Sequence, residues 1–205
     1  MDPGALQELV PSLALGIGLA ACAGLRAWLP LLLTGLLARF DYLTLGPSFQ
    51  FLTTNRALVL FGAATLIELL GDKFPVVDHA LDAIGTVLRP AAGALLAASV
   101  FWQIQDPLTA IALGLVIGAP SALLPHAAKS ALRTISTTFT GGLATPLISL
   151  LEDVIALGIF VLAVLLPLVM AALVALTAFL LLRWWKGRAR TQAPPPPASL
   201  PTATA

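Results

Sequence analysis

The sequence predicts an all-α, polytopic helical membrane protein with about six transmembrane helices. Of its 205 residues, 59% are hydrophobic and 10% are charged, whereas a soluble domain carries roughly 25% charged residues. A helix that crosses a bilayer needs about 20 apolar residues. Apolar runs that can supply such helices lie at 12–38, 57–71, 88–104, 107–125, 143–165 and 167–183. They leave no room for a separate soluble domain, so residues 1–192 are expected to form one helical membrane domain.

The two ends of the chain are predicted to differ. The first ten residues, MDPGALQELV, carry acidic side chains where a secretory signal has basic ones, so the first apolar run is interpreted as an uncleaved membrane helix. Basic residues between Arg183 and Arg190, beside Trp184 and Trp185, follow the last run and predict a cytoplasmic C-terminus. Residues 193–205 are rich in Pro, Ala and Thr and are predicted to be a disordered tail.

The first apolar run raises a question of orientation. With six crossings the N-terminus is also cytoplasmic, and Arg39 and Arg56 then fall on the opposite side, against the usual excess of basic residues in cytoplasmic loops. This conflict is relieved if Arg26 and Pro30 break the run into two shorter helices, because proline disrupts a helix interior.

Short matches in the same order in both halves predict an internal repeat. The pairs are LALGIGLA (13–20) with IALGLVIGA (111–119), GLR (24–26) with ALR (131–133), and LIELLGD (66–72) with LISLLED (147–153). A 3+3 inverted repeat of residues 10–104 and 105–184 would build a site where the repeats meet, as in many transporters. Chance similarity in a chain rich in Leu, Ala and Gly is the alternative explanation.

Ionisable residues gather between positions 67 and 90 of a chain that is otherwise almost uncharged. Glu68 and Asp72 are four residues apart, so both carboxylates face one side of a helix and repel each other. Water, protonation of one carboxylate, or a cation such as Lys73 would relieve this repulsion. Glu68 lies inside an apolar run, where a charged group is costly and indicates a functional site. It is therefore the better candidate for a proton or cation site.

The segment that begins at Pro75 is predicted to be an amphipathic helix. Its polar face holds Asp78, Asp82, Gly85 and Arg89, and its apolar face holds Val77, Leu81, Ile84 and Leu88. In one interpretation it is a connector helix that lies along the membrane surface with its polar face in water. In the other, Asp78 and Asp82 join Glu68 and Asp72 around a cation or a protonatable cavity.

Residues 126–146 form a basic counterpart, because Lys129 and Arg133 share one helical face with His126. Asp78 or Asp82 is expected to pair with Lys129 or Arg133, each charge relieving the desolvation cost of the other.

The basic residues also allow an anion site. In that alternative, Arg26, Arg89, Lys129 and Arg133 bind the anion together with the hydroxyl and N–H groups of TTFTGG (137–142). Glu152 and Asp153 point about 100° apart on a helix, so they can serve different partners, and one of them is expected to pair with Arg26 or Arg133.

Several classes of function have no support in the sequence. A formal net charge of +1, with scattered basic residues, argues against nucleic acid as a partner. A single cysteine, Cys22, rules out an internal disulfide and a cysteine-based zinc site. His79 and His126 show no metal-ligand spacing and no nucleophile or nucleotide motif occurs, so no metal, no cofactor and no catalytic residue is expected.

The segments GLRAWLPLLLTGLLAR, GDKFPVVDHALDAIGTVLRPAAGALLA and STTFTGGLATPLISLLEDV carry a family resemblance. Over most of residues 12–183 the chain resembles the bacterial integral membrane family called domain of unknown function 4126. The resemblance implies a compact multi-span helical protein of the bacterial inner membrane, and it implies no activity.

The leading functional hypothesis is a small transporter or channel-like protein for an ion, a small solute or a lipid headgroup. Glu68, Asp72, Asp78 and Asp82 would form its cation or proton side, and Arg26, Lys129 and Arg133 its anion or counter-charge side. One alternative is a structural or assembly protein whose charges only pair helices. Another is a membrane enzyme acting on lipid phosphates through magnesium held by carboxylates.

The expected partners are the lipid bilayer and an anionic lipid or small ion. Closely spaced glycines at 16, 18, 114 and 118 would let helices approach tightly, within the chain or in a homo-oligomer.

Overall fold

The structure, a computed structural model, describes residues 3–141 and 143–165, together with residues 173, 176–177, 179–181 and 183. Side chains are described from residue 11 onward in these ranges, apart from those at positions 75, 76, 78 and 79. Within this part of the chain the regular secondary structure is helical, and no strand occurs. The all-α class expected from the sequence is confirmed. The expected tail at 193–205 lies outside the described residues.

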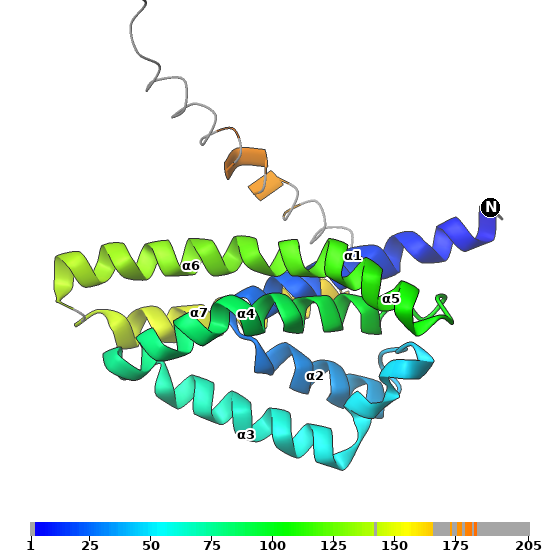
Figure 1. Cartoon of the computed structure of the whole chain (residues 1–205), viewed down its shortest axis with the longest axis horizontal. Helices are drawn as coiled ribbons and strands as arrows, with labels where there is room; N and C mark the ends of the chain where they lie inside the picture. The colour runs from blue at the N-terminus through cyan, green and yellow to red at the C-terminus, as the bar shows by residue number, and fades with distance from the viewer. Residues whose placement is uncertain are drawn as a thin grey trace, which may run out of the picture.

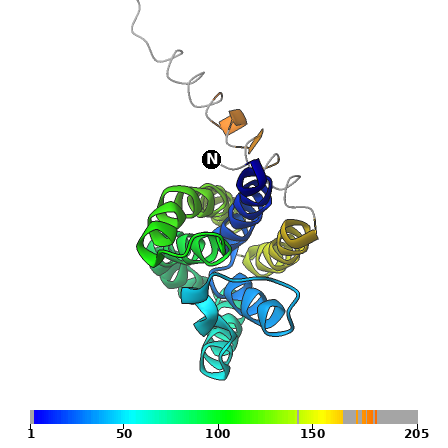
Figure 2. The ribbon, with the colours of Figure 1, turned by 90° about the vertical axis from the view of Figure 1, so that its right-hand side faces the viewer.

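The helices of the described residues form an elongated bundle (Figure 1). They are α1 (Pro3–Leu25), α2 (Trp28–Arg39), η1 (Pro47–Thr53), α3 (Asn55–Gly71), α4 (Pro75–Ser99), α5 (Pro107–Leu113), η2 (Gly114–Gly118), α6 (Ala119–Thr140) and α7 (Thr145–Leu165). The segment η1 is a 3₁₀ helix, and η2 is a π-helical segment that joins α5 to α6. Helix α1 packs against α4, α6 and α7, and α3 lies at the outer edge beside α2 (Figure 2).

The first apolar run is broken where the sequence allowed a break. Helix α1 ends at Leu25 and α2 begins at Trp28, with Arg26 and Ala27 between them. Pro30 falls in the first turn of α2, where its missing N–H leaves no helical hydrogen bond unmade. Figure 1 shows α2 running back towards the end of the molecule at which α1 starts, with the break near the middle of the long axis.

The two amphipathic segments are not separate connectors, and this expectation is wrong. The acidic segment and the following apolar run form one helix, α4, which continues through Pro90. The basic segment likewise continues the run before it, so residues 107–140 form one helix through Pro125. In surroundings with little water a helix keeps its backbone hydrogen bonds internal, and neighbouring helices let it tolerate proline.

The described residues contain three helices long and apolar enough to cross a membrane, Ala80–Ser99, Pro107–Thr140 and Thr145–Leu165. A fourth is added if η1 and α3, bent by 62° at their junction, count as one span. The pieces Pro11–Leu25 and Trp28–Arg39 are shorter. These helices indicate an integral membrane protein. Six spans are not found in this part of the chain, and most of the run at 167–183 lies outside it.

Close contacts between helices depend on glycine. A Cβ added to Gly24 of α1 would overlap the backbone carbonyl of Ala122 on α6. Additions at Gly114 or Gly118 would likewise overlap backbone carbonyls of α4, at Ala94 and Gly93. These glycines therefore bring together helices of the same chain, and they place the end of α1 directly against α6.

The bundle has an apolar exterior and a polar cluster inside, next to a buried apolar core. Large apolar residues of α3 and α7 point outward, among them Val59, Leu60, Leu66, Ile67, Leu70, Leu147, Leu151 and Val154. Several charged side chains point inward, and Arg26 and Asp72 are each 0% exposed. An apolar exterior suits contact with lipid tails, and buried ionisable groups in such a protein face the interior of the bundle.

Candidate functional site

The candidate site is a buried ion network that joins the α1–α2 break to α3, α4, α6 and α7. We define it by its charged members, the carboxylates Glu68, Asp72, Asp82, Glu152 and Asp153 and the basic residues Arg26, Arg89, Lys129 and Arg133. All of them are candidates from the sequence. Of the other two candidates, Lys73 is exposed, and the side chain of Asp78 lies outside the description.

Asp72 is the centre of the network. It follows the last residue of α3, and one of its oxygens, Oδ2, accepts hydrogen bonds from Arg26, Lys129 and Arg133. The distances from Oδ2 to Lys129 Nζ and to Arg133 Nη2 are both 3.3 Å. A carboxylate is normally disfavoured at a helix C-terminus by the helix dipole. Three cations on one oxygen offset that cost and tie α3 to α6 and to the end of α1.

Arg26 uses the break between α1 and α2 to reach two other helices. Besides Asp72, its guanidinium contacts α7, where Nη2 lies 2.5 Å from Asp153 Oδ1 and donates to Ser149 Oγ at 3.1 Å. Ser149 was not among the sequence candidates. Its alignment with Glu68 in the repeat, LIELLGD with LISLLED, was the signal that could have found it.

Glu152 and Asp153 have different nearest partners, although Arg26 Nη2 lies within 4.0 Å of both carboxylates. Arg133 binds Glu152 through two parallel contacts, Nε to Oε1 at 2.8 Å and Nη2 to Oε2 at 2.5 Å. Such a fork fixes both direction and distance. Lys129 Nζ lies 3.1 Å from Glu152 Oε2, so Glu152 holds two basic residues of α6 against α7.

Glu68 is placed differently, because it caps a helix. Its Oε1 accepts from the backbone N–H of Ala27 at 3.2 Å, and its Oε2 accepts from that of Trp28 at 3.4 Å. The first N–H groups of a helix lack internal partners, and residue 27 supplies no side-chain cap. Trp28 also stacks on Phe61 of α3, with ring centroids 6.1 Å apart. The only basic residue within 4.0 Å of Glu68 among the described ion pairs is Arg89, at 3.9 Å.

Arg89 connects the network to a short chain of polar contacts between α4 and α6. Its Nη1 lies 3.0 Å from Asp82 Oδ1 and 2.5 Å from His126 Nδ1. Because a guanidinium only donates, Nδ1 must accept, and the proton of a neutral His126 is then on Nε2. That nitrogen lies 3.3 Å from Thr86 Oγ1, whose own hydrogen is donated to the Asp82 carbonyl. Sequence periodicity placed His126 on this face but could not assign its tautomer.

Among the described side chains, one of the expected pairs between the acidic and the basic segment is present. Lys129 Nζ lies 3.9 Å from Asp82 Oδ1. The interpretation of residues 75–88 as a helix with a solvated polar face is wrong. Gly85 and Arg89 on that face are buried and Asp82 is partly buried, whereas Ile84 on the apolar face is exposed. Residues 138–141 are exposed at the end of α6 and Thr137 is partly buried, and the hydroxyl groups of Thr138 and Thr140 donate to backbone carbonyls of α6.

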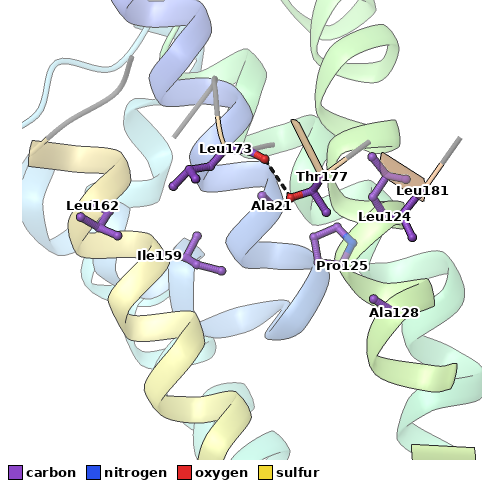
Figure 3. A pocket seen from close by; sticks show the side chains of 9 residues that line it. All are labelled: Ala21, Leu124, Pro125, Ala128, Ile159, Leu162, Leu173, Thr177 and Leu181. Atoms are coloured by element: carbon purple, nitrogen blue, oxygen red, sulfur yellow. Dashed lines mark hydrogen bonds between the residues drawn. The ribbon is translucent and has the colours of Figure 1, made fainter. Parts of the chain in front are cut away.

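Two cavities differ in their relation to the network. A small cavity of about 30 Å³ touches Glu68 and Arg89 and is otherwise lined by Ala27 at the α1–α2 break, Trp28 of α2 and residues of α4. A larger one of about 360 Å³ lies between α1, α6, α7 and Leu173, Thr177 and Leu181 (Figure 3). No charged residue lines it, and the Thr177 hydroxyl donates a hydrogen bond to the Leu173 carbonyl at 2.8 Å. Of these two cavities, only the small one touches members of the ion network.

No group of three or more His, Cys, Asp or Glu side chains that could hold a metal ion occurs among the described residues. The carboxylates of the network face basic residues and backbone N–H groups instead. A magnesium-dependent lipid enzyme therefore gains no ligand set from this part of the chain.

Apolar helices around a charged interior define an integral membrane protein with a polar core. Within that class, the chain belongs to the family described as Domain of unknown function (DUF4126), whose model matches residues 13–187. The match includes every residue of the ion network. No curated protein and no solved structure matches the chain.

Proposed function

We propose that the protein is a small membrane transporter or channel-like protein for ions, and that the ion network takes up and releases a proton during transport. The main support for this proposal is the net charge of the ion network. Among the described residues it holds five carboxylates but only four basic side chains. An uncompensated charge in a buried site is costly. A bound proton or cation restores neutrality, and its exchange provides a transport step.

Glu68 is the best placed carboxylate to carry that proton. Asp72, Asp82, Glu152 and Asp153 each have a basic group within 3.3 Å, whereas the nearest one to Glu68 is at 3.9 Å. Glu68 also touches the small cavity, which has room for about one or two water molecules. A proton can therefore reach Glu68 through water without breaking a close ion pair.

We further propose that the two halves of the chain are repeats whose equivalent residues meet in the network. The sequence matches relate Arg26 to Arg133 and Asp72 to Asp153. Arg26 contacts both of these aspartates, and Arg133 contacts Asp72. An experimental structure in a membrane mimetic tests the repeat, because a single rotation should superpose residues 24–26 and 66–72 on residues 131–133 and 147–153. Failure of any such rotation would reject it.

A structural role is the second candidate, and one observation favours it. Arg26 connects the α1–α2 break with both α3 and α7, so the charges could serve only to fix helix positions. Under this alternative the charged residues would affect stability and assembly but no ion would move.

Proton flux into liposomes separates the two candidates. Wild type, Glu68→Gln and the control Asp106→Asn are reconstituted with a pH-sensitive dye inside and a potassium gradient to balance charge. Glutamine has nearly the same shape as glutamate but carries no charge and no exchangeable carboxyl proton, so we expect Glu68→Gln to fold and to lose flux by at least about tenfold. Asp106 caps α5 outside the network, and its variant should match wild type. Equal flux in Glu68→Gln, or none in wild type, would contradict the proposal.

A further inference from the structure

The Glu68 carboxylate occupies a site with the features of an anion-binding site. Its two oxygens lie on the N–H groups of Ala27 and Trp28, at the start of the 12-residue helix α2. A helix N-terminus carries partial positive charge and unpaired N–H donors, and therefore attracts anions. In the structure the anion at this position is part of the protein itself.

Arg89 provides an independent indication that an anion binds here. Its side chain is 1% exposed, yet its Nε has no hydrogen-bond partner among the described residues. Its Nη2 stays 3.9 Å from Glu68 Oε1, beyond hydrogen-bond distance. Arg89 and Glu68 line the same cavity of about 30 Å³. Buried guanidinium N–H groups almost always have an acceptor. A donor without a partner beside a cavity therefore indicates that a small ligand with hydrogen-bond acceptors can bind there.

Gly85 keeps the guanidinium of Arg89 uncovered. A Cβ added at Gly85 would lie 3.1 Å from Cζ and 3.2 Å from Nε of Arg89. Contacts this short would push the guanidinium aside, because real Cβ atoms seldom come so close. Glycine at position 85 therefore sets the distance between Arg89 and the cavity.

We propose that a small monovalent inorganic anion, of which chloride is the test case, binds to the Ala27 and Trp28 N–H groups and Arg89 when Glu68 is protonated. Protonation removes the charge of Glu68 and weakens it as an acceptor, which frees the donors for a diffusible anion. Proton and anion binding are then linked: acid pH favours the bound anion. The inference deepens the proposed function, since it names the ion that would move with the proton, but binding can be measured without transport.

The other charged and titratable groups around Glu68 set the background of this linkage. They are Arg26 at the α1–α2 break, Cys22 on α1, Asp72 at the end of α3, Asp82 and Arg89 on α4, and His126 and Lys129 on α6. The three cations Arg26, Arg89 and Lys129 outnumber the two further carboxylates, Asp72 and Asp82. The surroundings of Glu68 thus remain favourable to an anion after Glu68 itself is neutralised.

The test is chloride binding to the purified full chain in detergent, measured by titration calorimetry with sodium gluconate as the ionic-strength control. Wild type should bind chloride more tightly at about pH 5 than at about pH 8. Glu68→Gln should bind at both, and at about pH 8 at least about tenfold more tightly than wild type. Gly85→Ala in the Glu68→Gln background should weaken binding. Its control is Gly62→Ala, where an added Cβ meets only Leu32 Cδ1 at 4.0 Å.

Three outcomes would overturn the inference: no chloride binding by Glu68→Gln, the same pH dependence in Glu68→Gln as in wild type, or equal binding with Gly85→Ala. Thermal unfolding of each variant shows whether it is folded at the temperature of the titration. Parallel flux measurements separate this inference from the proposed function. Chloride binding without any ion flux keeps the anion site and rejects transport, whereas proton flux without chloride binding rejects the anion site and keeps transport.

Discussion

Replacing Asp72 with Asn is expected to destabilise the protein by about 3–5 kcal/mol, the usual cost of removing one partner from a buried ion pair. Asparagine has nearly the same shape, so the effect isolates the charge. Arg26, Lys129 and Arg133 all donate to Oδ2 of Asp72, and the substitution removes the carboxylate charge that these three buried cations share. Unfolding in mixed micelles by increasing denaturing detergent, followed by circular dichroism, measures the loss.

Asp106→Asn is the matched control for this substitution. Asp106 caps α5 at the surface by accepting from Thr109 N at 2.8 Å, and asparagine caps a helix about as well as aspartate. Its unfolding midpoint should stay close to that of wild type. If the two variants unfold at the same detergent concentration, the network does not contribute to stability in the way that its geometry implies.

Replacing Gly24 with Ala is expected to be the most disruptive change of one methyl group in the described bundle. The added Cβ would overlap the Ala122 carbonyl oxygen and lie 2.9 Å from its carbon. Because this obstacle is backbone, α1 must move away from α6. Overpacking of this kind costs about 1–3 kcal/mol or more. The shift also displaces Arg26, two residues further on, so both stability and ion flux should fall.

Gly158→Ala makes the same chemical change on α7 in open space, with no atom within 4 Å of the added Cβ. Alanine favours the helix by about 0.5–1 kcal/mol over glycine, so this variant should be slightly more stable than wild type. The same detergent unfolding compares the two. A Gly24→Ala protein as stable as Gly158→Ala would show that α1 and α6 do not approach as closely as the structure has them.

The sequence was sufficient for features that depend on composition and spacing. Helical class follows from apolar runs, and the break at Arg26 follows from a charge and Pro30 inside such a run. The spacing of Asp82, Lys129, Glu152 and Asp153 indicated which helical faces carry charge. Each of these features is local, so each can be read from residues close in the chain.

Features that depend on how helices pack against each other could not be predicted from the sequence. Periodicity separated the two faces of residues 75–88 but could not say which one points inward, and the solvated interpretation failed because the polar face meets α6. The role of Glu68 as a cap of α2 requires 40 residues of chain to fold back onto Trp28. The continuation of α4 through Pro90 was also missed, because the amphipathic pattern up to Leu88 and the apolar run after it were treated as separate segments.

The position of Arg26 has a consequence for the order in which the protein is made. An arginine in the middle of a membrane costs about 2.5–3.5 kcal/mol when it has no partner, and its partners Asp72 and Asp153 are synthesised 46 and 127 residues later. The first two helices are therefore expected to settle at their final depth only after α3 has been made and Asp72 can accept the guanidinium, and Asp153 of α7 completes the pairing later.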